Sequence, residues 1–324
     1  MIKALEIEET VLVSCDYYIH GRIIIPNGVT EIGEYAFSRR TGLTSIEIPN
    51  SVTKIGEWAF QGCTGLTSIT IHDSVTEIGE GAFQGCTDLT SIEIPNSVTR
   101  IGPGVLHGCT GLKSIIVVER NKHFSAQDGI LYSKDKTLLH TCLPSKIGAV
   151  IIPKSVTRIG ENAFYGCADL TSIEIPNSVT RIGDFAFLDC AGLTSIEIPN
   201  SVTRIGDFAF EGCTHLMSVK IPNSVTEIGD SAFLRCAGLT SIEIPNSVTE
   251  IGDYAFSNCT GLQEVHCRIE HLSEVKIRND IFGINDIFEN IDKSQVTVYV
   301  PIGTGYEYRH HDFFQGFKAI VIEK

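Results

Sequence analysis

The sequence lacks long hydrophobic runs and is poor in basic residues. Of its 324 residues, 25 are Lys or Arg and 39 are Asp or Glu, which gives a formal net charge of −14 at pH 7. Proteins that bind the phosphate backbone of nucleic acids need basic patches, and so do proteins that adhere to anionic membranes. No stretch of 18 apolar residues occurs, so we expect no membrane-spanning helix. The sequence therefore predicts neither a nucleic-acid partner nor membrane insertion.

The motifs of common catalytic and cofactor sites are also missing. No GxSxG, Walker, HExxH or GxGxxG motif occurs. The run His310-His311-Asp312 lacks the i, i+4 spacing of helical metal ligands, and no cysteines are paired as CxxC. We therefore expect no enzyme activity, no catalytic residues, no cofactor and no metal site. An enzyme that uses the irregular C-terminal region is a remote alternative.

What the sequence does contain is one short segment repeated along most of its length. Its first leucine recurs every 23 residues, with one longer step of 58 residues between the fourth and fifth copies. The nine copies begin at Leu43, Leu66, Leu89, Leu112, Leu170, Leu193, Leu216, Leu239 and Leu262. A fixed period of about 20–50 residues is the signature of a stacked solenoid. Each unit is too short to bury its own apolar face, so its neighbours must cover it.

One copy, LTSIEIPNSVTRIGDFAFEGCT, predicts the shape of a coil. Residues 195–198 alternate with period two, which favours a short strand with its isoleucines inward. The Pro-Asn-Ser that follows is turn chemistry, and residues 202–205 predict a second short strand. Residues 207–210 are expected to form one helical turn. Stacked coils then predict a phenylalanine ladder, formed by Phe37, Phe60, Phe83, Phe164, Phe187, Phe210, Phe233 and Phe256.

The repeat pattern LxxIxIPxSVTxIGxxAFxxC closely resembles the BspA-like (Treponema pallidum-type) leucine-rich repeats. The resemblance covers roughly residues 22–262. It implies a β-rich leucine-rich-repeat solenoid of the α/β repeat class. This solenoid is right-handed and capped at both ends, with a parallel β-sheet along one face and a short strand plus one helical turn on the other. It also implies surface display, adhesion and host–microbe contact, and it carries no catalytic residues.

The departures from the repeat predict the domain organisation. Residues 1–21 should form an N-terminal cap, residues 22–262 the solenoid, and residues 263–324 a C-terminal cap. Residues 118–150 interrupt the period and predict an enlarged coil that bears a hairpin around residues 134–136. We expect one continuous structural domain, and the alternative is a hinge between two domains at this interruption.

The C-terminal cap should contain four elements. Residues 296–301 predict a last solenoid strand, residues 306–314 a helix and residues 319–323 a final strand. Residues 280–291, which include Phe282, predict an amphipathic segment packed against the last coil.

Eleven cysteines are unusual, and eight of them occupy one repeat position. These eight are Cys63, Cys86, Cys109, Cys167, Cys190, Cys213, Cys236 and Cys259. Free cysteine behaves as a small buried hydrophobe, and stacked copies hold their Cβ vectors parallel, which keeps the sulfurs apart. A ladder of reduced thiols is therefore expected, with disulfides and a metal site as alternatives. Cys15, Cys142 and Cys267 lie outside the ladder.

Two columns of side chains are candidate interaction sites. The first is an acidic face on the outward strand positions, formed by Glu47, Glu93, Glu174, Glu197 and Glu243. It could attract a cation or a basic partner, and its alternative is a solvated sheet surface. The second is a column that varies between copies and so should be partly exposed; its aromatic members are Tyr35, Trp58, Phe185, Phe208 and Tyr254. Exposed aromatic residues are typical interface anchors, although these could merely cover the turn beneath them.

The function expected is a non-enzymatic binding module that offers a long curved surface to a protein or a glycan. The alternative is a structural spacer without a specific ligand. The first residues contain early glutamates and no small-residue cleavage site. Together with free thiols they predict a cytoplasmic location, whereas the family resemblance implies the cell surface or secretion.

Overall fold

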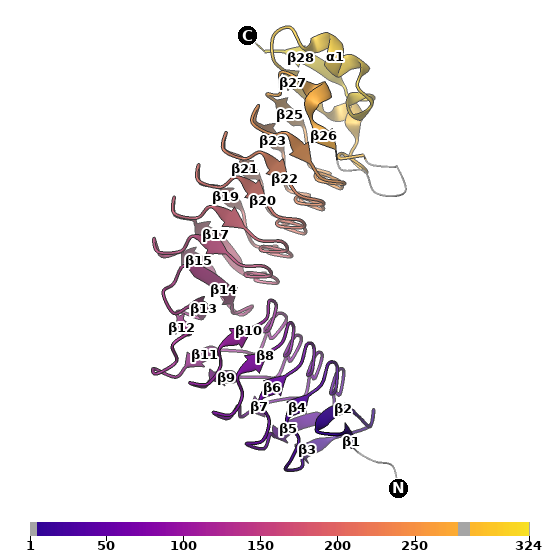
Figure 1. Cartoon of the computed structure of the whole chain (residues 1–324). Helices are drawn as coiled ribbons and strands as arrows, with labels where there is room; N and C mark the ends of the chain where they lie inside the picture. Colours follow the sequence, from indigo (N-terminus) through magenta and orange to yellow (C-terminus); the bar gives the residue numbers. More distant parts are fainter. Residues whose placement is uncertain (1–4, 278–285, 324) are drawn as a thin grey trace. The chain divides into compact units, whose positions relative to one another are not determined.

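The computed structural model describes residues 5–277 and 286–323 of the chain. The chain forms two compact units (Figure 1). The N-terminal unit comprises residues 1–146 and 162–165, and the C-terminal unit comprises residues 147–161 and 166–324. Each unit is a stack of coils in which strands of successive coils pair in parallel. The predicted solenoid is thus confirmed, while one continuous domain over residues 1–324 stays a prediction.

One row of strands, which are mostly three to five residues long, lies along one side of the coils of each unit (Figure 1). In the N-terminal unit they are β3 (Gly21–Ile24), β5 (Leu43–Glu47), β7 (Ser68–Ile69), β9 (Ser91–Ile94) and β11 (Ser114–Val117). In the C-terminal unit they are β15 (Gly148–Ile151), β17 (Leu170–Glu174), β19 (Ser195–Glu197), β21 (Ser218–Lys220), β23 (Ser241–Ile244), β25 (Glu264–Cys267), β27 (Thr297–Val300) and β28 (Ala319–Ile322). The pairing register between repeats is one full period, as in Ser195↔Ser218.

Two-residue strands form a second row of parallel ladders. In the N-terminal unit these are β4 (Glu31–Ile32), β6 (Lys54–Ile55), β8 (Glu77–Ile78) and β10 (Arg100–Ile101). In the C-terminal unit they are β16 (Arg158–Ile159), β18 (Arg181–Ile182), β20 (Arg204–Ile205), β22 (Glu227–Ile228), β24 (Glu250–Ile251) and β26 (Lys276–Ile277). Successive strands pair through their isoleucines, as Ile205 with Ile228 and Ile228 with Ile251. In these strands the apolar side chain points inward while its neighbour along the strand points out.

The core of each unit consists of identical residues stacked coil upon coil. Ile196 and Phe210 are 5% and 0% exposed, as the repeat requires. The phenylalanine rings stack face to face, with centroids 5.2 Å apart for Phe37 and Phe60 and 5.1 Å apart for Phe187 and Phe210. This spacing follows from the strand separation of about 4.8 Å. The ladder continues through Phe256 to Phe288 at 5.6 Å, beyond the last recognisable repeat.

The turn that carries the phenylalanine is not the helical turn expected from the sequence. Its N–H groups alternate between two kinds of acceptor. Phe208 and Phe210 donate to Asp230 and Ala232 of the next coil at 2.7 Å, whereas Glu211 donates back to Phe208 at 3.2 Å. A helix would satisfy its N–H groups within the segment. The observed turns instead donate half of their backbone N–H groups to the next coil. Hydrogen bonds on the turn face therefore also hold successive coils together.

The N-terminal segment and the interruption of the repeat form antiparallel elements. Strands β1 (Leu5–Glu8) and β2 (Val11–Cys15) form a hairpin, and β2 pairs in parallel with β4 of the first coil. In the interruption, β12 (Phe124–Gln127), β13 (Ile130–Ser133) and β14 (Leu138–Cys142) form an antiparallel meander. The turn between β13 and β14 contains residues 134–136, where the sequence predicted a hairpin.

The C-terminal region adds two more strands to the sheet of the C-terminal unit. Strand β27 pairs in parallel with β25, and β28 pairs with β27. The helix α1 (Gly305–His310) is followed by the 3₁₀ turn η3 (Asp312–Phe314); two further 3₁₀ turns are η1 (Leu272–Glu274) and η2 (Lys293–Gln295). Of the segment expected over residues 280–291, Ile287 and Phe288 are buried, while Phe282 lies outside the described residues.

Candidate functional site

Four of the predicted aromatic residues form two stacked pairs on the turn face. In the N-terminal unit the rings of Tyr35 and Trp58 lie 5.1 Å apart at an angle of 13°. In the C-terminal unit the rings of Phe185 and Phe208 lie 4.9 Å apart at 5°. Tyr35 is 47% exposed, and the other three rings are half-buried. Tyr254 is also half-buried and lies two coils after Phe208. The two stacked pairs are formed by aromatic residues of adjacent coils.

These aromatic residues hold a backbone conformation that bulky side chains rarely adopt. The angle φ is 55° at Tyr35, 49° at Trp58 and 55° at Phe208. A left-handed conformation costs a residue with a Cβ roughly 1–2 kcal/mol. All nine members of the column share it: Tyr35, Trp58, Gly81, Gly104, Asn162, Phe185, Phe208, Ser231 and Tyr254. The glycines and the asparagine were the sequence signal for this conformation, because those residues adopt it most readily.

The acidic column lies on the outward side of the long strands, and cations interrupt it. All five glutamates are exposed. Arg22 pairs with Glu47 at 2.5 Å, and Arg268 lies 3.6 Å from Glu243. Lys220 stands directly opposite Glu197 in the strand register. Exposed pairs of this kind contribute about 0–1 kcal/mol each.

Part of the acidic column lines a groove on the sheet face of the C-terminal unit. The groove has a volume of about 860 Å³ and contains Glu174, Glu197 and Lys220 from successive strands. At one end it includes Lys154 and Ile151, and Ile151 is 73% exposed. The groove therefore carries charges of both signs beside one exposed apolar side chain. Sequence reasoning missed Ile151, which stands where the next two coils have glutamate.

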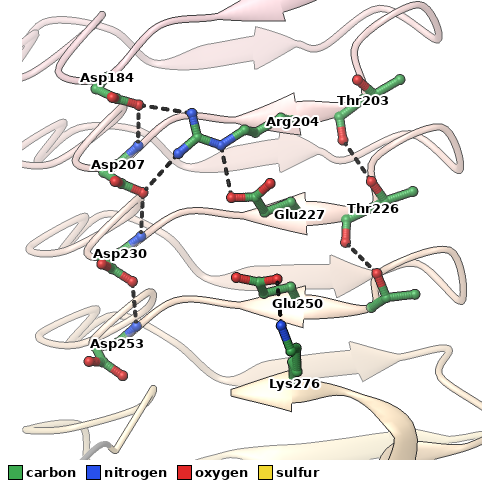
Figure 2. A network of polar contacts seen from close by, with 11 residues as sticks. Asp184, Thr203, Arg204, Asp207, Thr226, Glu227, Asp230, Glu250, Asp253 and Lys276 are labelled. Atoms are coloured by element: carbon green, nitrogen blue, oxygen red, sulfur yellow. Dashed lines mark hydrogen bonds and ion pairs between the residues drawn. The ribbon is translucent and has the colours of Figure 1, made fainter. Parts of the chain in front are cut away.

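A ladder of aspartates runs along the corner between the short strands and the turns. Figure 2 shows one carboxylate for each of four coils, from Asp184 to Asp253. The side chain of Asp184 accepts the backbone N–H of Asp207 at 2.9 Å, and that of Asp207 accepts the N–H of Asp230 at 3.0 Å. Asp230 continues the ladder to the N–H of Asp253 at 3.1 Å. The sequence placed Asp207 at a helix start, whereas its carboxylate bonds the next coil.

One arginine is clamped among these carboxylates. The guanidinium of Arg204 contacts Asp184 and Asp207, each at 3.3 Å, and Glu227 at 2.8 Å (Figure 2). Burial is the main cause that raises the pKa of the Asp207 carboxyl above its ordinary value, and the carboxylates of Asp184 and Asp230 raise it further. The N–H of Asp230 and the charge of Arg204 act in the opposite direction. The positive charge of Arg204 thus offsets the electrostatic repulsion between the carboxylates of the aspartate ladder.

We expect Arg204→Gln to lower the free energy of unfolding by about 1–2 kcal/mol at pH 7, because several partly exposed carboxylates lose their shared cation. A raised pKa in the folded state favours the protonated form, so the cost of the Asp207 charge is absent at low pH and appears as the pH rises through that pKa. The loss caused by Arg204→Gln should therefore be smaller at pH 4 than at pH 7. Denaturant unfolding at the two pH values measures both quantities.

The matched control is Asp230→Asn, which keeps a side-chain oxygen for the N–H of Asp253 but removes one negative charge. This variant should leave stability unchanged or raise it slightly at pH 7. A loss from Asp230→Asn as large as that from Arg204→Gln would contradict the electrostatic account.

The eleven cysteines are free thiols, and all are buried. Six ladder thiols, those of Cys63, Cys86, Cys109, Cys213, Cys236 and Cys259, donate hydrogen bonds to the phenylalanine carbonyl 26 residues earlier. The distance is 2.9 Å from Cys63 to Phe37 and 3.1 Å from Cys236 to Phe210. Burial raises the pKa of Cys63 to about 12 and that of Cys109 to about 12. Because the thiolate is the reactive form, these thiols resist oxidation while the coils stay closed.

Nowhere in residues 5–277 and 286–323 do three or more His, Cys, Asp or Glu side chains gather in a way that could hold a metal ion. None of the helices in this part of the chain has the length and hydrophobicity that a membrane span requires.

The model of the BspA-type leucine-rich-repeat region, in six copies, matches residues 6–128 and 141–263, which is more than half of the chain. The chain belongs to the BspA-type leucine-rich-repeat family. The unmatched residues between the two ranges fall on strands β13 and β14 of the antiparallel meander. No curated protein matches the chain.

Solved structures of bacterial proteins, two of them described as leucine-rich, are similar to this one. A leucine-rich cell surface protein from Faecalibacterium prausnitzii is 29% identical, with 86% of this chain and 96% of that chain covered and a TM-score of 0.55. A leucine-rich-repeat protein from Eubacterium ventriosum is 28% identical, with 83% and 82% covered and a TM-score of 0.64. The pneumococcal vaccine antigen PcpA shares the fold, at 21% identity, 97% and 85% coverage and a TM-score of 0.67.

The family and its cell-surface neighbour support a repeat-built binding module. In a leucine-rich-repeat solenoid each coil contacts only its neighbours, so the exposed positions of successive coils form long columns. The aromatic column and the acidic column of this protein are two such surfaces.

Proposed function

We propose that this protein is a non-catalytic binding module that recognises another protein through the aromatic pairs of its turn face. The observation that carries the proposal is the left-handed backbone at Tyr35, Trp58, Phe185 and Phe208. The same column accepts glycine at Gly81 and Gly104, so packing of the coil does not require a ring there. Strained residues that the fold does not require are concentrated at functional sites.

The arrangement of the rings favours a protein over a glycan. Sugars stack on the open face of an aromatic ring, whereas in a stacked pair each ring covers one face of the other. What such a pair presents to a partner is mainly ring edges, which pack against the side chains of protein interfaces. Partly exposed Trp and Tyr residues are also the commonest energetic centres of protein interfaces.

We test the proposal with glycine variants, because glycine keeps the left-handed backbone that alanine would strain. Wild type, Trp58→Gly and Phe208→Gly are measured by surface plasmon resonance against a panel of purified extracellular proteins and a glycan array. Wild type should bind at least one protein. At least one of the two variants should bind it about tenfold or more weakly, the loss typical of an interface anchor.

The matched control is Ser231→Gly, which changes the same left-handed column without removing a ring. It should bind like the wild type, and all variants should keep the far-ultraviolet circular dichroism of the folded solenoid. Binding to glycans alone, or protein binding that neither ring deletion weakens, would overturn the proposal. If no probe binds the wild type, the spacer function is favoured instead.

We propose the cell surface as the location, because the similar protein from Faecalibacterium prausnitzii is a cell surface protein. Free thiols favour a cytoplasmic location when they are accessible, but the thiols of this protein do not oppose a location at the cell surface. All of them are buried, and burial raises the pKa of Cys259 to about 12. A thiol held in its protonated form inside a packed core survives in an oxidising compartment. Fractionation of the source cells, followed by immunoblotting, tests the location.

A further inference from the structure

The C-terminal unit ends in a strand whose apolar side chains are only partly covered. Strand β28 is the last strand of its sheet, and no residue in the described part of the chain pairs with its outer edge (Figure 1). All four residues of the strand, Ala-Ile-Val-Ile, are apolar. Ile322 is 45% exposed and Val321 is 38% exposed. An unpaired backbone edge and exposed apolar side chains thus coincide in one strand.

Two of these residues occupy core positions of the coil. In the strand register Ile320 follows Val298 and Ile322 follows Val300. Val298 and Val300 are 0% exposed, whereas Ile320 is only half-buried. Helix α1 covers part of Ile322, since a Cβ placed on Gly305 would lie 3.0 Å from its Cδ1. The apolar wall that a coil normally receives from its neighbour is therefore incomplete at β28.

The edge strands at the N-terminal end differ from β28 in their protection. Natural proteins protect exposed edges with charged residues, prolines or bulges. Strand β1 carries Glu6 and Glu8 and has a register shift, and β3 carries the exposed Arg22 and also has a shift. Strand β28 contains no charge and no proline, and its register with β27 is regular. The open edge of β28 therefore has the properties of a pairing surface.

We infer that β28 pairs in the antiparallel direction with β28 of a second copy of this chain. The N–H of Glu323 donates to Val300 of β27 at 2.9 Å. Because successive N–H groups of a strand point to opposite edges, those of Ile320 and Ile322 point to the open edge. Both find acceptors when Ile320 of one copy lies opposite Ile322 of the other. This register places Val321 opposite Val321 of the second copy, on a two-fold axis.

The pairing is self-complementary in polarity and in charge. Isoleucine meets isoleucine on the core side and valine meets valine on the outer side, so each copy completes the apolar wall of the other. The antiparallel direction also brings Lys318 of each copy to the end of the strand at which Glu323 of the other lies. His266, at 2.9 Å, and Arg268 hold the Glu323 carboxylate at this end. A parallel pair would bring like charges together, which is unfavourable.

A head-to-tail contact between β28 and β3 of another copy is hindered at the N-terminal end. Strand β2 pairs with β4, and β1 pairs with β2, so the row of short strands extends two strands beyond the coil of β3. This hairpin stands beside the open edge of β3 and obstructs the approach of a second solenoid. The structure therefore favours a closed two-fold dimer over an open filament.

Sedimentation velocity of the full chain, over about 1–100 µM, measures the association. The wild type should form a species of twice the chain mass and nothing larger. Val321→Lys places two ammonium groups opposite each other on the axis and should raise the Kd about tenfold or more. The matched control is Val321→Thr, which is neutral and β-branched like valine and should keep the dimer. Both variants should retain the circular dichroism of the wild type.

Two further variants identify the strand and its register. Ile24→Lys adds a charge to β3, where Ile24 is 61% exposed, and should leave the dimer unchanged. Val321→Cys places two thiols on the axis, where the Cα atoms of a non-hydrogen-bonded pair lie about 4.5 Å apart, within the range of a disulfide. Diamide should oxidise this variant to a covalent dimer. The wild type should not cross-link, because its eleven thiols are buried. N-ethylmaleimide blocks the remaining thiols before denaturing electrophoresis.

A wild type that is monomeric at about 100 µM would overturn the inference. So would dissociation of the dimer by Ile24→Lys, an unchanged dimer in Val321→Lys, or a dimer whose Val321→Cys variant does not cross-link. The inference is independent of the proposed function. Val321→Lys leaves the aromatic pairs of the turn face in place and should bind a partner of a single pair like the wild type, while Trp58→Gly should still dimerise.

Discussion

Replacing Phe210 by alanine is expected to lower the free energy of unfolding by about 3–5 kcal/mol. The ring is 0% exposed and stacks between Phe187 at 5.1 Å and Phe233 at 5.2 Å. Its removal leaves a cavity in the middle of the ladder, and neighbouring coils cannot close it, because their hydrogen bonds fix the strand spacing. Denaturant unfolding followed by circular dichroism measures the change.

The matched control lies two residues away in the same turn. Phe208→Gly removes a half-buried ring and at the same time relieves a left-handed conformation with φ of 55°. The two effects oppose each other, so we expect a change within about 1 kcal/mol. Equal losses from Phe210→Ala and Phe208→Gly would show that the ladder and the exposed column are not the distinct layers described here.

The second large effect concerns the corner where the short strands meet the turns. A Cβ at Gly229 would lie 2.6 Å from the backbone nitrogen of Asp207 and 2.7 Å from the carbonyl carbon of Gly206. These are backbone atoms of the preceding coil, and they cannot rotate away. Gly229→Ala should therefore separate two coils and destabilise the protein by about 3 kcal/mol, at the upper end of overpacking effects.

Gly148→Ala serves as the comparison, since a Cβ there has no atom within 4 Å. Its φ of 77° still imposes the left-handed penalty of about 1–2 kcal/mol. In thermal unfolding, Gly229→Ala should have a lower melting temperature than Gly148→Ala, and Gly148→Ala a lower one than the wild type. The reverse order would mean that coil spacing tolerates a methyl group between the two backbones.

Much of the fold could be predicted from the sequence because the same pattern of apolar and polar residues recurs in every copy of the repeat. Period-two alternation in residues 195–198 fixes which side chains face inward, and a spacing of 23 residues brings Phe187, Phe210 and Phe233 into one ladder. The burial of the cysteine column was predictable for the same reason. A pattern that every coil repeats is a property of the stack and needs no knowledge of any single coil.

The turn was predicted less well. Residues 207–210 have helix-compatible composition, but the left-handed residues around Phe210, with φ of 55° at Phe208 and 71° at Gly212, turn the N–H groups alternately toward the next coil. Other copies of the repeat have glycine at these positions, and glycine favours a left-handed backbone. The left-handed conformation was still not predicted, because other copies have aromatic residues in the same column, and those rarely adopt it.

The sequence by itself determined the period, the parallel stacking and the identity of the core ladders, since these depend on interactions that recur between adjacent copies. Only the tertiary structure decided what the irregular residues do together. It paired the exposed aromatics into stacks and placed Arg204 among three carboxylates. Those arrangements depend on side chains from different columns that differ from coil to coil. Their relative positions follow from the path of the backbone around each turn, which the repeat pattern does not specify.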